Sequence, residues 1–316
     1  MTASNGEKAR LDDAARAGWL YFIAGNTQDE IAKKLNVSRA TAQRLVSLCL
    51  SERLITFRLE HPIAVCMDLA TRLKERFALR YCEVVPFDSR APATAGLAER
   101  AAALLEMHLQ AEKPVIVGIG TGRAMRAAVE QVPSMNCPNH QLVSLVGNIS
   151  PDGSASAFDA IARLADVTKV RHYPMPLPVF VSSEAEREQL LRIYAVSRIR
   201  AMAEKADLRL VGIGQIDPGA QLHIDGFITR EELLELMRLG AVGEIIGWAY
   251  GAAGQILDGG SNQRVTSIPL QVPATALTVG AALGAAKTPA ILAALRGRLL
   301  NGLITDEATA KALLAA

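Results

Sequence analysis

The feature that most constrains the fold is an alternation of short apolar runs with longer stretches of helical periodicity, which begins near Tyr81. Apolar runs of this length are typical of buried strands. A strand, a helix and a second strand in succession form a right-handed crossover, which makes the strands parallel. We therefore expect an α/β domain with a mainly parallel sheet. The expected strands are 115–117, 142–146, 208–211, 244–248, 265–270 and 276–279, and the expected helices are 91–110, 124–132, 185–205 and 230–239.

A change of pattern near Pro62 divides the chain into two parts. A chain of 316 residues is longer than one small core usually needs, so two domains are expected. We place a helical domain at residues 1–59 and the larger α/β domain at residues 60–316. The stretch 64–78, just after the boundary, is predicted to be a linking helix.

The N-terminal part has the pattern of a helix-turn-helix. Thr27 and Ser38 are good N-cap residues, and Asn36 tolerates the left-handed backbone of a tight turn. Ala32 is small at the point where two crossing helices would approach. The alternative is a helical hairpin with a purely structural role. The pattern predicts helices over 9–24, 27–35 and 38–52, and a strand over 54–59.

Positive charge is concentrated in this segment. Between Lys33 and Arg58 there are six Lys or Arg residues and one acid, Glu52, a net charge of +5, whereas the whole chain carries +2. Such a concentration suits a DNA-facing surface, because neutralised phosphates supply most of the non-specific affinity. A solvated helix face would have the same charge pattern, and charge alone does not distinguish the two.

The third predicted helix is expected to enter the major groove of double-stranded operator DNA. Arg pairs bidentately with guanine and Gln with adenine, so Arg39, Gln43 and Arg44 are the predicted base readers, with the DNA backbone as their alternative target. Lys33 and Lys34 are predicted to contact phosphates, although either could be an ordinary surface charge. The full predicted set is Lys33, Lys34, Ser38, Arg39, Thr41, Gln43 and Arg44.

A Gly-rich loop, Gly118–Arg123, follows the expected strand 115–117 and precedes a helix. Backbone amides in such a loop can bind an anion at the helix N-terminus, and Thr121 adds a hydroxyl. A tight structural turn is the alternative. A dinucleotide site is not expected, because Arg123 stands where the third glycine of that motif would be.

Other function classes lack support in the sequence. The four cysteines and five histidines have no metal-ligand spacing, and no cofactor or metal is expected. Acids such as Asp217, Asp225 and Asp258 stand in turn-like contexts, which favours turn residues over catalytic bases. The N-terminus has no signal-peptide pattern and no segment is apolar enough to cross a membrane, so we expect a cytoplasmic protein without a membrane partner.

Taken together, these segments resemble the SorC/DeoR family of sugar-binding transcriptional regulators over nearly the full length. The Gly118–Arg123 loop is similar to the first ligand loop of the family, and 239–244 to its central G-A-V-G-[DE] motif. Further similar segments are 21–22, 28–32, 38–41, 44–45, 287–291, 294–296 and 303–307.

The resemblance implies an effector domain with a fold like that of sugar-phosphate isomerases, a tetramer, and a repressor-type regulator whose DNA binding responds to a sugar, a polyol or their phosphates. The implied effector contacts are Gly120, Thr121, Gly122, Arg123, Glu244 and Lys287. Two departures from the family pattern, Gly251 in place of an Asp and Ala282-Leu283-Gly284 before Lys287, favour an unphosphorylated ligand, which needs fewer anion contacts.

Two other functions are consistent with parts of the sequence. One is an isomerase-like enzyme of the sugar-phosphate class with an accessory helical domain. The predicted helix-turn-helix argues against it, as does the lack of an evident acid–base pair in a ligand loop. The other is a DNA-architectural protein, which would have no use for a large α/β domain with a Gly-rich loop. We therefore expect a regulator without catalytic residues.

Overall fold

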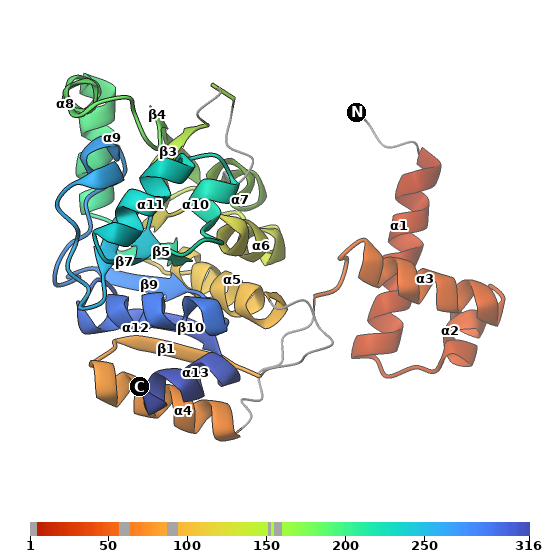
Figure 1. Cartoon of the computed structure of the whole chain (residues 1–316). Helices are drawn as coiled ribbons and strands as arrows, with labels where there is room; N and C mark the ends of the chain where they lie inside the picture. The colour runs from red at the N-terminus through yellow and green to blue at the C-terminus, as the bar shows by residue number, and fades with distance from the viewer. Residues whose placement is uncertain (1–4, 57–63, 87–93, 151–152, 155–159) are drawn as a thin grey trace. The chain divides into compact units, whose positions relative to one another are not determined.

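The structure, a computed structural model, describes residues 5–56, 64–86, 94–150, 153–154 and 160–316. The chain divides into two compact units, Met1–Glu60 and His61–Ala316 (Figure 1). Each unit has a hydrophobic core of its own.

The first unit is helical over its described residues. Its small core contains Ala17, Ile31, Ala32, Ala42 and Val46. The elements are α1 (Asn5–Gly18), the π-helical turn η1 (Trp19–Ile23), α2 (Gln28–Leu35) and α3 (Arg39–Ser51). A side chain added at Gly18 would overlap the Sγ of Cys49, so α1 and α3 approach closely at this glycine.

Side chains at the helix ends explain where α2 and α3 begin. The Thr27 side chain accepts a hydrogen bond from the Glu30 amide, and the Glu30 carboxylate accepts one from the Thr27 amide at 2.8 Å, which is a capping box. Asn36 has φ 52° and ends α2 in the left-handed conformation. Ser38 Oγ accepts from the Thr41 amide and caps α3. Both N-caps and the turn residue are those expected from the sequence.

The strand predicted over 54–59 is not formed by Leu54–Thr56, and the rest of it lies outside the described residues. Arg53 has φ 54°, and the amide of Leu54 donates to the carbonyl of Cys49 at 2.9 Å. These interactions close the C-terminus of α3 in the manner of a left-handed helix cap, so the chain turns instead of extending.

The second unit is built on a seven-stranded parallel sheet with the strand order β1-β10-β9-β5-β2-β3-β4. This confirms the predicted α/β class with a mainly parallel sheet. The strands are β1 (Tyr81–Val85), β2 (Ile116–Ile119), β3 (Gln141–Ile149), β4 (Arg171–Pro178), β5 (Leu208–Gly212), β9 (Leu277–Ala281) and β10 (Gly302–Asp306).

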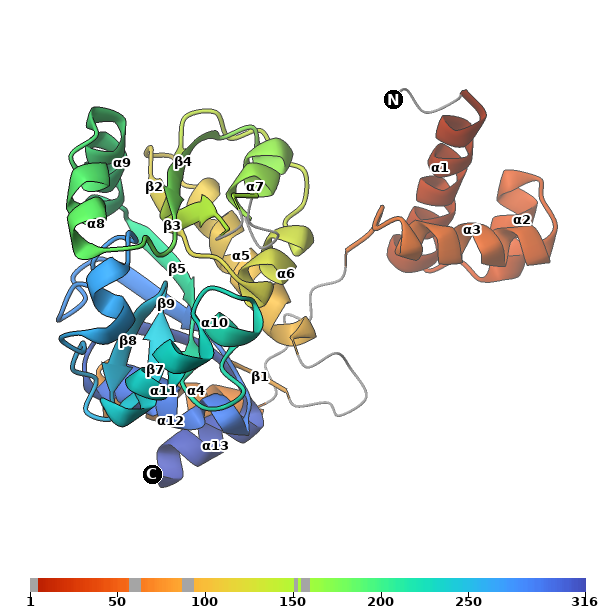
Figure 2. The same cartoon turned by 45° about the horizontal axis from the view of Figure 1, so that its top comes forward.

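Helices cover both faces of this sheet (Figure 2). Successive strand residues alternate between two apolar clusters: Leu142 and Ile304 pack in one, Val143 and Leu303 in the other. The first cluster includes α5 (Ala95–Leu109), α6 (Arg123–Gln131) and α7 (Ile161–Thr168). The second includes α4 (Ala64–Phe77), α9 (Tyr194–Glu204), α12 (Thr288–Arg296) and α13 (Glu307–Ala315).

A small antiparallel sheet stands apart from the seven-stranded one. It consists of β6 (Gly214–Gln215), β7 (Ala241–Ile245) and β8 (Trp248–Gly251). Together with α10 (Gln221–Ile224) and α11 (Arg230–Arg238) it encloses a third apolar cluster. Figures 1 and 2 both show α10 and α11 near β7.

Several sequence predictions differ from this structure. The stretch 64–78 is not a linker, because α4 packs on β1 and α13 and buries Cys66, Leu69 and Leu73. The predicted strand 244–248 is a hairpin between β7 and β8, outside the parallel sheet. The predicted helix 185–205 is interrupted at Arg192-Ile193 and forms α8 (Glu184–Leu191) and α9. Helix α5 begins at Ala95, and residues 91–93 lie outside the described residues.

The predicted strand 265–270 forms only an isolated bridge, between Val265 and Phe180, and does not join either sheet. Arg187 Nε donates to the Val265 carbonyl at 2.6 Å, and the Arg200 guanidinium donates to the carbonyls of Thr266 and Ser267. Trp248 Nε1 donates to the carbonyl of Ile268 at 3.0 Å. Side-chain donors thus satisfy the carbonyls that a neighbouring strand would otherwise bind.

Candidate functional site

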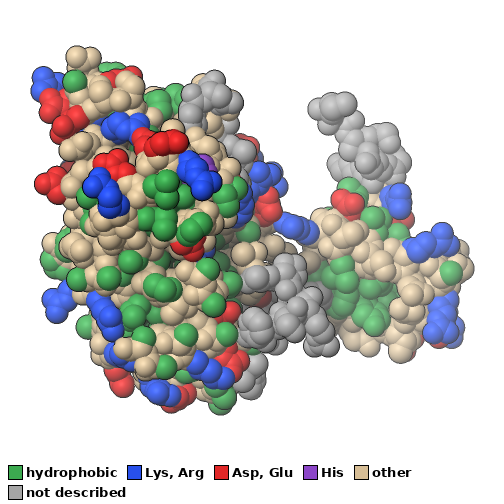
Figure 3. Space-filling view, in the orientation of Figure 1, with side chains coloured by type: hydrophobic (Ala, Val, Ile, Leu, Met, Phe, Trp, Pro, Cys, Tyr) green, Lys and Arg blue, Asp and Glu red, His purple; other side chains and the backbone are tan. Residues whose placement is uncertain are grey.

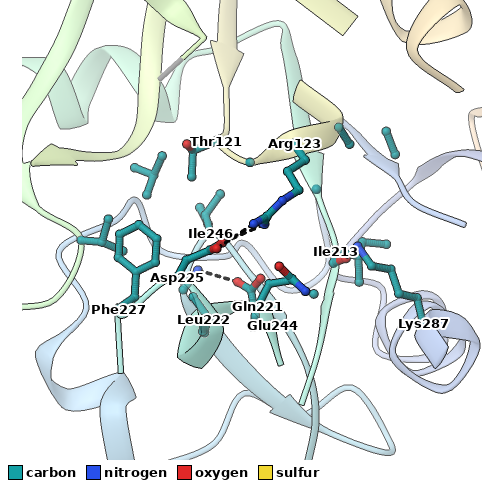
Figure 4. A pocket seen from close by; sticks show the side chains of 18 residues that line it. Thr121, Arg123, Ile213, Gln221, Leu222, Asp225, Phe227, Glu244, Ile246 and Lys287 are labelled. Atoms are coloured by element: carbon teal, nitrogen blue, oxygen red, sulfur yellow. Dashed lines mark hydrogen bonds and ion pairs between the residues drawn. The ribbon is translucent and has the colours of Figure 1, made fainter. Parts of the chain in front are cut away.

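A cavity opens at the carboxyl edge of the central strands. The register pairs Ile119 with Leu210 and Gly212 with Ala281, so the segments after β2, β5 and β9 leave the sheet side by side. In open α/β sheets this edge is the usual place for a ligand. The cavity has a volume of about 130 Å³ (Figure 4). Pockets for drug-sized ligands measure roughly 300–1,000 Å³, so this one suits a smaller molecule.

The Gly-rich loop forms one side of the cavity. Thr121, Gly122 and Arg123 line it, whereas Gly120 does not. The Gly120 amide donates to the Leu210 carbonyl at 2.9 Å, so the predicted ligand contact at Gly120 is a link within the sheet. Gly122 has φ 108° and ψ 172° and is the N-cap residue of α6. Only glycine adopts this conformation readily.

Arg123 forms a bidentate ion pair with Asp225, and both residues line the cavity (Figure 4). The two N–O distances are 2.8 and 2.7 Å. The Arg123 side chain is 53% exposed and that of Asp225 only 15%. The hydrogen bonds to Asp225 raise the pKa of the Arg123 guanidinium, although partial burial acts in the opposite direction. The turn-like context of Asp225 in the sequence gave no sign of this partner, which is distant along the chain.

Glu244 extends from β7 to the cavity wall. Its Oε2 accepts a hydrogen bond from the Gly247 amide at 2.8 Å. Burial raises the pKa of the Glu244 carboxyl, and the Gly247 amide and the charge of Lys287 oppose this rise. A side chain added at Gly214 would overlap Oε1 of Glu244, so glycine at 214 makes room for the carboxylate.

Lys287 reaches the cavity from the short helical turn η3 (Ala285–Lys287). Its Nζ donates to the carbonyl of Ile213 at 2.9 Å. Burial lowers the pKa of the Lys287 ammonium, and the charge of Glu244 acts against this effect. No acid–base pair was evident in a ligand loop of the sequence, but the fold brings Glu244 and Lys287 into one cavity.

One wall comes from a segment that the sequence pattern did not predict to contact a ligand. We define the wall segment as residues 217–228; it contains α10 and contributes Gln221, Leu222, Asp225 and Phe227 to the cavity. Val146, Val179 and Ile246 add apolar surface from other elements. Gly251, the departure from the family pattern after β7, does not line the cavity.

The residues predicted to contact DNA lie on the surface of the first unit. Thr41 is half-buried and the other six are exposed, namely Lys33, Lys34, Ser38, Arg39, Gln43 and Arg44. The Ser38 hydroxyl contacts the Thr41 hydroxyl at 2.8 Å. Arg39 lies 3.6 Å from the exposed Asp29, and Arg44 Nε donates to the Ala40 carbonyl at 3.3 Å. In Figure 3, Lys and Arg side chains lie along one side of this unit and hydrophobic side chains gather on another.

The fold and the cavity define a protein with an α/β unit, which has a pocket at the usual ligand-binding edge of its sheet, and a helical unit with a core of its own. A family described as "Putative sugar-binding domain" matches residues 61–315. The erythritol catabolism regulatory protein EryD of Brucella abortus (strain 2308) is 35% identical over 309 residues, 97% of this chain and 98% of that protein. The transcriptional regulator LsrR of Enterobacter sp. (strain 638) is 32% identical over 307 residues, covering 95% and 92%.

Among solved structures, the full-length sorbitol operon regulator SorC from Klebsiella pneumoniae has a similar fold. Its TM-score is 0.75 at 24% identity, over 99% of this chain and 100% of that one. The chain therefore belongs to the SorC/DeoR family of sugar-binding transcriptional regulators. This membership confirms the predicted regulator and favours it over the isomerase-like enzyme. Among the residues the structure describes, no helix is long and apolar enough to cross a membrane, and no group of three or more His, Cys, Asp or Glu could hold a metal ion.

Proposed function

We propose that residues 1–59 bind operator DNA and that a small sugar, polyol or sugar phosphate, bound in the cavity of residues 60–316, controls this binding. The main support for the effector site is that residues from separate elements line the same cavity. Thr121, Gly122, Arg123, Glu244 and Lys287 come from three distant segments, and all of them line one cavity at the carboxyl edge of the sheet. EryD and SorC, by their names, serve erythritol catabolism and a sorbitol operon.

In the first unit, α3 has the features of a recognition helix. Ala42 and Val46 are buried on one face, which leaves Arg39, Gln43 and Arg44 exposed on the other. Arg and Gln side chains on such a face can read guanine and adenine. Ser38 and Thr41 lie at the N-terminus of the helix, where amides and hydroxyls can contact a phosphate. Lys33 and Lys34 extend from the last turn of α2 and would position the unit on the DNA backbone.

Under this proposal, the protein is a cytoplasmic homotetramer that acts as a repressor-type regulator and not as an enzyme. A symmetric assembly presents recognition helices in pairs, so its operator should be pseudo-palindromic. The pair of Glu244 and Lys287 would then serve to bind hydroxyl groups, since a carboxylate accepts and an ammonium donates hydrogen bonds.

The proposal is tested with Arg39→Ala and Arg44→Ala, compared with Arg16→Ala, which removes an exposed positive charge from α1. The probe is DNA selected from a random pool by the wild-type protein. Each α3 variant should lose about 1–3 kcal/mol of binding free energy and relax specificity at one base pair. Arg16→Ala should change only the non-specific affinity. Gel-shift titrations in which the α3 variants keep wild-type affinity and sequence preference would disprove the role of α3.

A further inference from the structure

The charged groups that line the cavity form two opposed pairs. The titratable lining residues are two cations, Arg123 and Lys287, and two acids, Asp225 and Glu244. Arg123 faces Asp225, and Lys287 lies in the electrostatic field of Glu244. The cavity therefore has cations, but each is accompanied by an acid of the protein itself.

The Arg123–Asp225 pair occupies two of the five N–H donors of the guanidinium, those that form its end-on fork. Two guanidinium N–H groups point at the two carboxylate oxygens of Asp225, at 2.8 and 2.7 Å. A bidentate fork of this kind is also how Arg holds a phosphate. Asp225 follows α10 as its C-cap residue and is mostly buried, so the wall segment holds its carboxylate in place. A phosphate ester would have to compete with this carboxylate.

The second pair is also balanced. Lys287 Nζ already donates to the Ile213 carbonyl at 2.9 Å. Burial lowers the pKa of Lys287 and raises the pKa of Glu244, and both shifts favour the neutral form of the group. Transfer of a proton from the ammonium to the carboxylate would leave the net charge of the pair at zero. In either protonation state, this pair gives an anion no uncompensated positive charge.

We propose that Asp225 determines the ligand class by holding Arg123, so that the cavity takes an uncharged polyol or sugar and discriminates against its phosphate ester. The inference rests on the proposed function of the cavity as an effector site. The remaining lining chemistry fits an uncharged polyol: the Gln221 amide offers donors and an acceptor for hydroxyls, and Phe227 and Ile246 offer apolar surface to carbon atoms. Asp225 is thus a specificity-determining residue that acts partly through Arg123.

The test compares wild type with Asp225→Asn, which removes the charge and keeps the shape. Asp217→Asn is the matched control, because Asp217 lies in the same wall segment, does not line the cavity, and accepts a hydrogen bond from the Gly219 amide that asparagine can also accept. Calorimetric titrations and thermal shifts use four- to six-carbon polyols (erythritol, ribitol and sorbitol), their phosphate monoesters, and inorganic phosphate. A bound probe raises the melting temperature by mass action.

Wild type and Asp217→Asn should bind a polyol at least about tenfold more tightly than its ester, the effect of one charge-assisted hydrogen bond. In Asp225→Asn this ratio should fall by about tenfold or more, because Arg123 then faces the ester without a competing carboxylate. If Asp225 had a purely structural role, Asp225→Asn would weaken the binding of the polyol and of its ester to the same extent. The double variant Arg123→Gln with Asp225→Asn removes the cation as well and should restore the preference for the polyol, which also provides a readout if the single variant folds poorly.

The outcomes separate this inference from the proposed function. If the wild type binds an ester more tightly than its polyol, and the ester changes DNA binding, the effector site stands and the role of Asp225 is wrong. An unchanged ratio in Asp225→Asn would likewise overturn that role. If neither series binds the wild type, the proposed effector site itself fails, and the inference fails with it.

Discussion

Substitution of Gly122 by alanine tests whether backbone conformation in the Gly-rich loop is essential. Gly122 has φ 108° and ψ 172°, a region that is nearly exclusive to glycine. A Cβ at this position meets no atom within 4 Å, so the expected penalty is conformational and not steric. Strain of this kind costs about 1–3 kcal/mol. A unit of this size loses about 2–4 °C in melting temperature per kcal/mol, so Gly122→Ala should melt roughly 2–12 °C lower.

The loop can relieve this strain only by moving the residues that line the cavity. We therefore expect Gly122→Ala also to weaken the binding of an uncharged probe such as erythritol, measured by calorimetric titration. Gly212→Ala is the control: Gly212 lines the same cavity, lacks a positive φ, and would place its Cβ 3.7 Å from the nearest atom, the Thr121 carbonyl oxygen. The free energy of unfolding of Gly212→Ala should lie within about 0.5 kcal/mol of the wild-type value. If Gly122→Ala melts and binds like wild type, the loop conformation is not the constraint that we infer.

Two further predictions concern the first unit and the assembly. Gly18→Ala should destabilise the packing of α1 on α3 by about 1–3 kcal/mol, because the new methyl overlaps Cys49 Sγ, and the additional change Cys49→Ala should recover most of the loss. Calorimetric melting measures both changes, and an undiminished stability of the single variant would contradict the close approach. Multi-angle light scattering at micromolar concentration should give four times the mass of the chain, 33.7 kDa, and a monomeric mass with or without DNA would refute the proposed tetramer.

Features that depend on neighbouring residues were predictable from the sequence. Thr27 and Ser38 cap their helices because a hydroxyl three residues before a free amide satisfies it locally. Asn36 was expected at the turn for a similar reason, since its left-handed conformation is a property of one residue. The parallel class of the sheet followed from periodicity over whole elements.

Features that depend on distant partners were not predictable in the same way. The apolar run at 265–270 has the composition of a strand, but guanidinium groups of Arg187 and Arg200 take its carbonyls. Strands β1, β4 and β10 were not predicted from the sequence. The structure places β10 between β1 and β9, two strands that are distant from each other in the sequence. Asp225 pairs with a residue more than a hundred positions away, and only the tertiary structure shows that the two belong to one site.

The wall segment has a consequence for how such proteins diverge. This segment connects β6 to α11, so none of its residues belongs to a strand of the seven-stranded sheet. Leu222 and Phe227 also pack against apolar clusters. Gln221 and Asp225 belong to none of these clusters, so the two polar residues can be replaced without a change in strand order or register. Ligand preference can therefore change at these two polar positions, which allows selection to alter the molecule that is sensed while the scaffold stays the same.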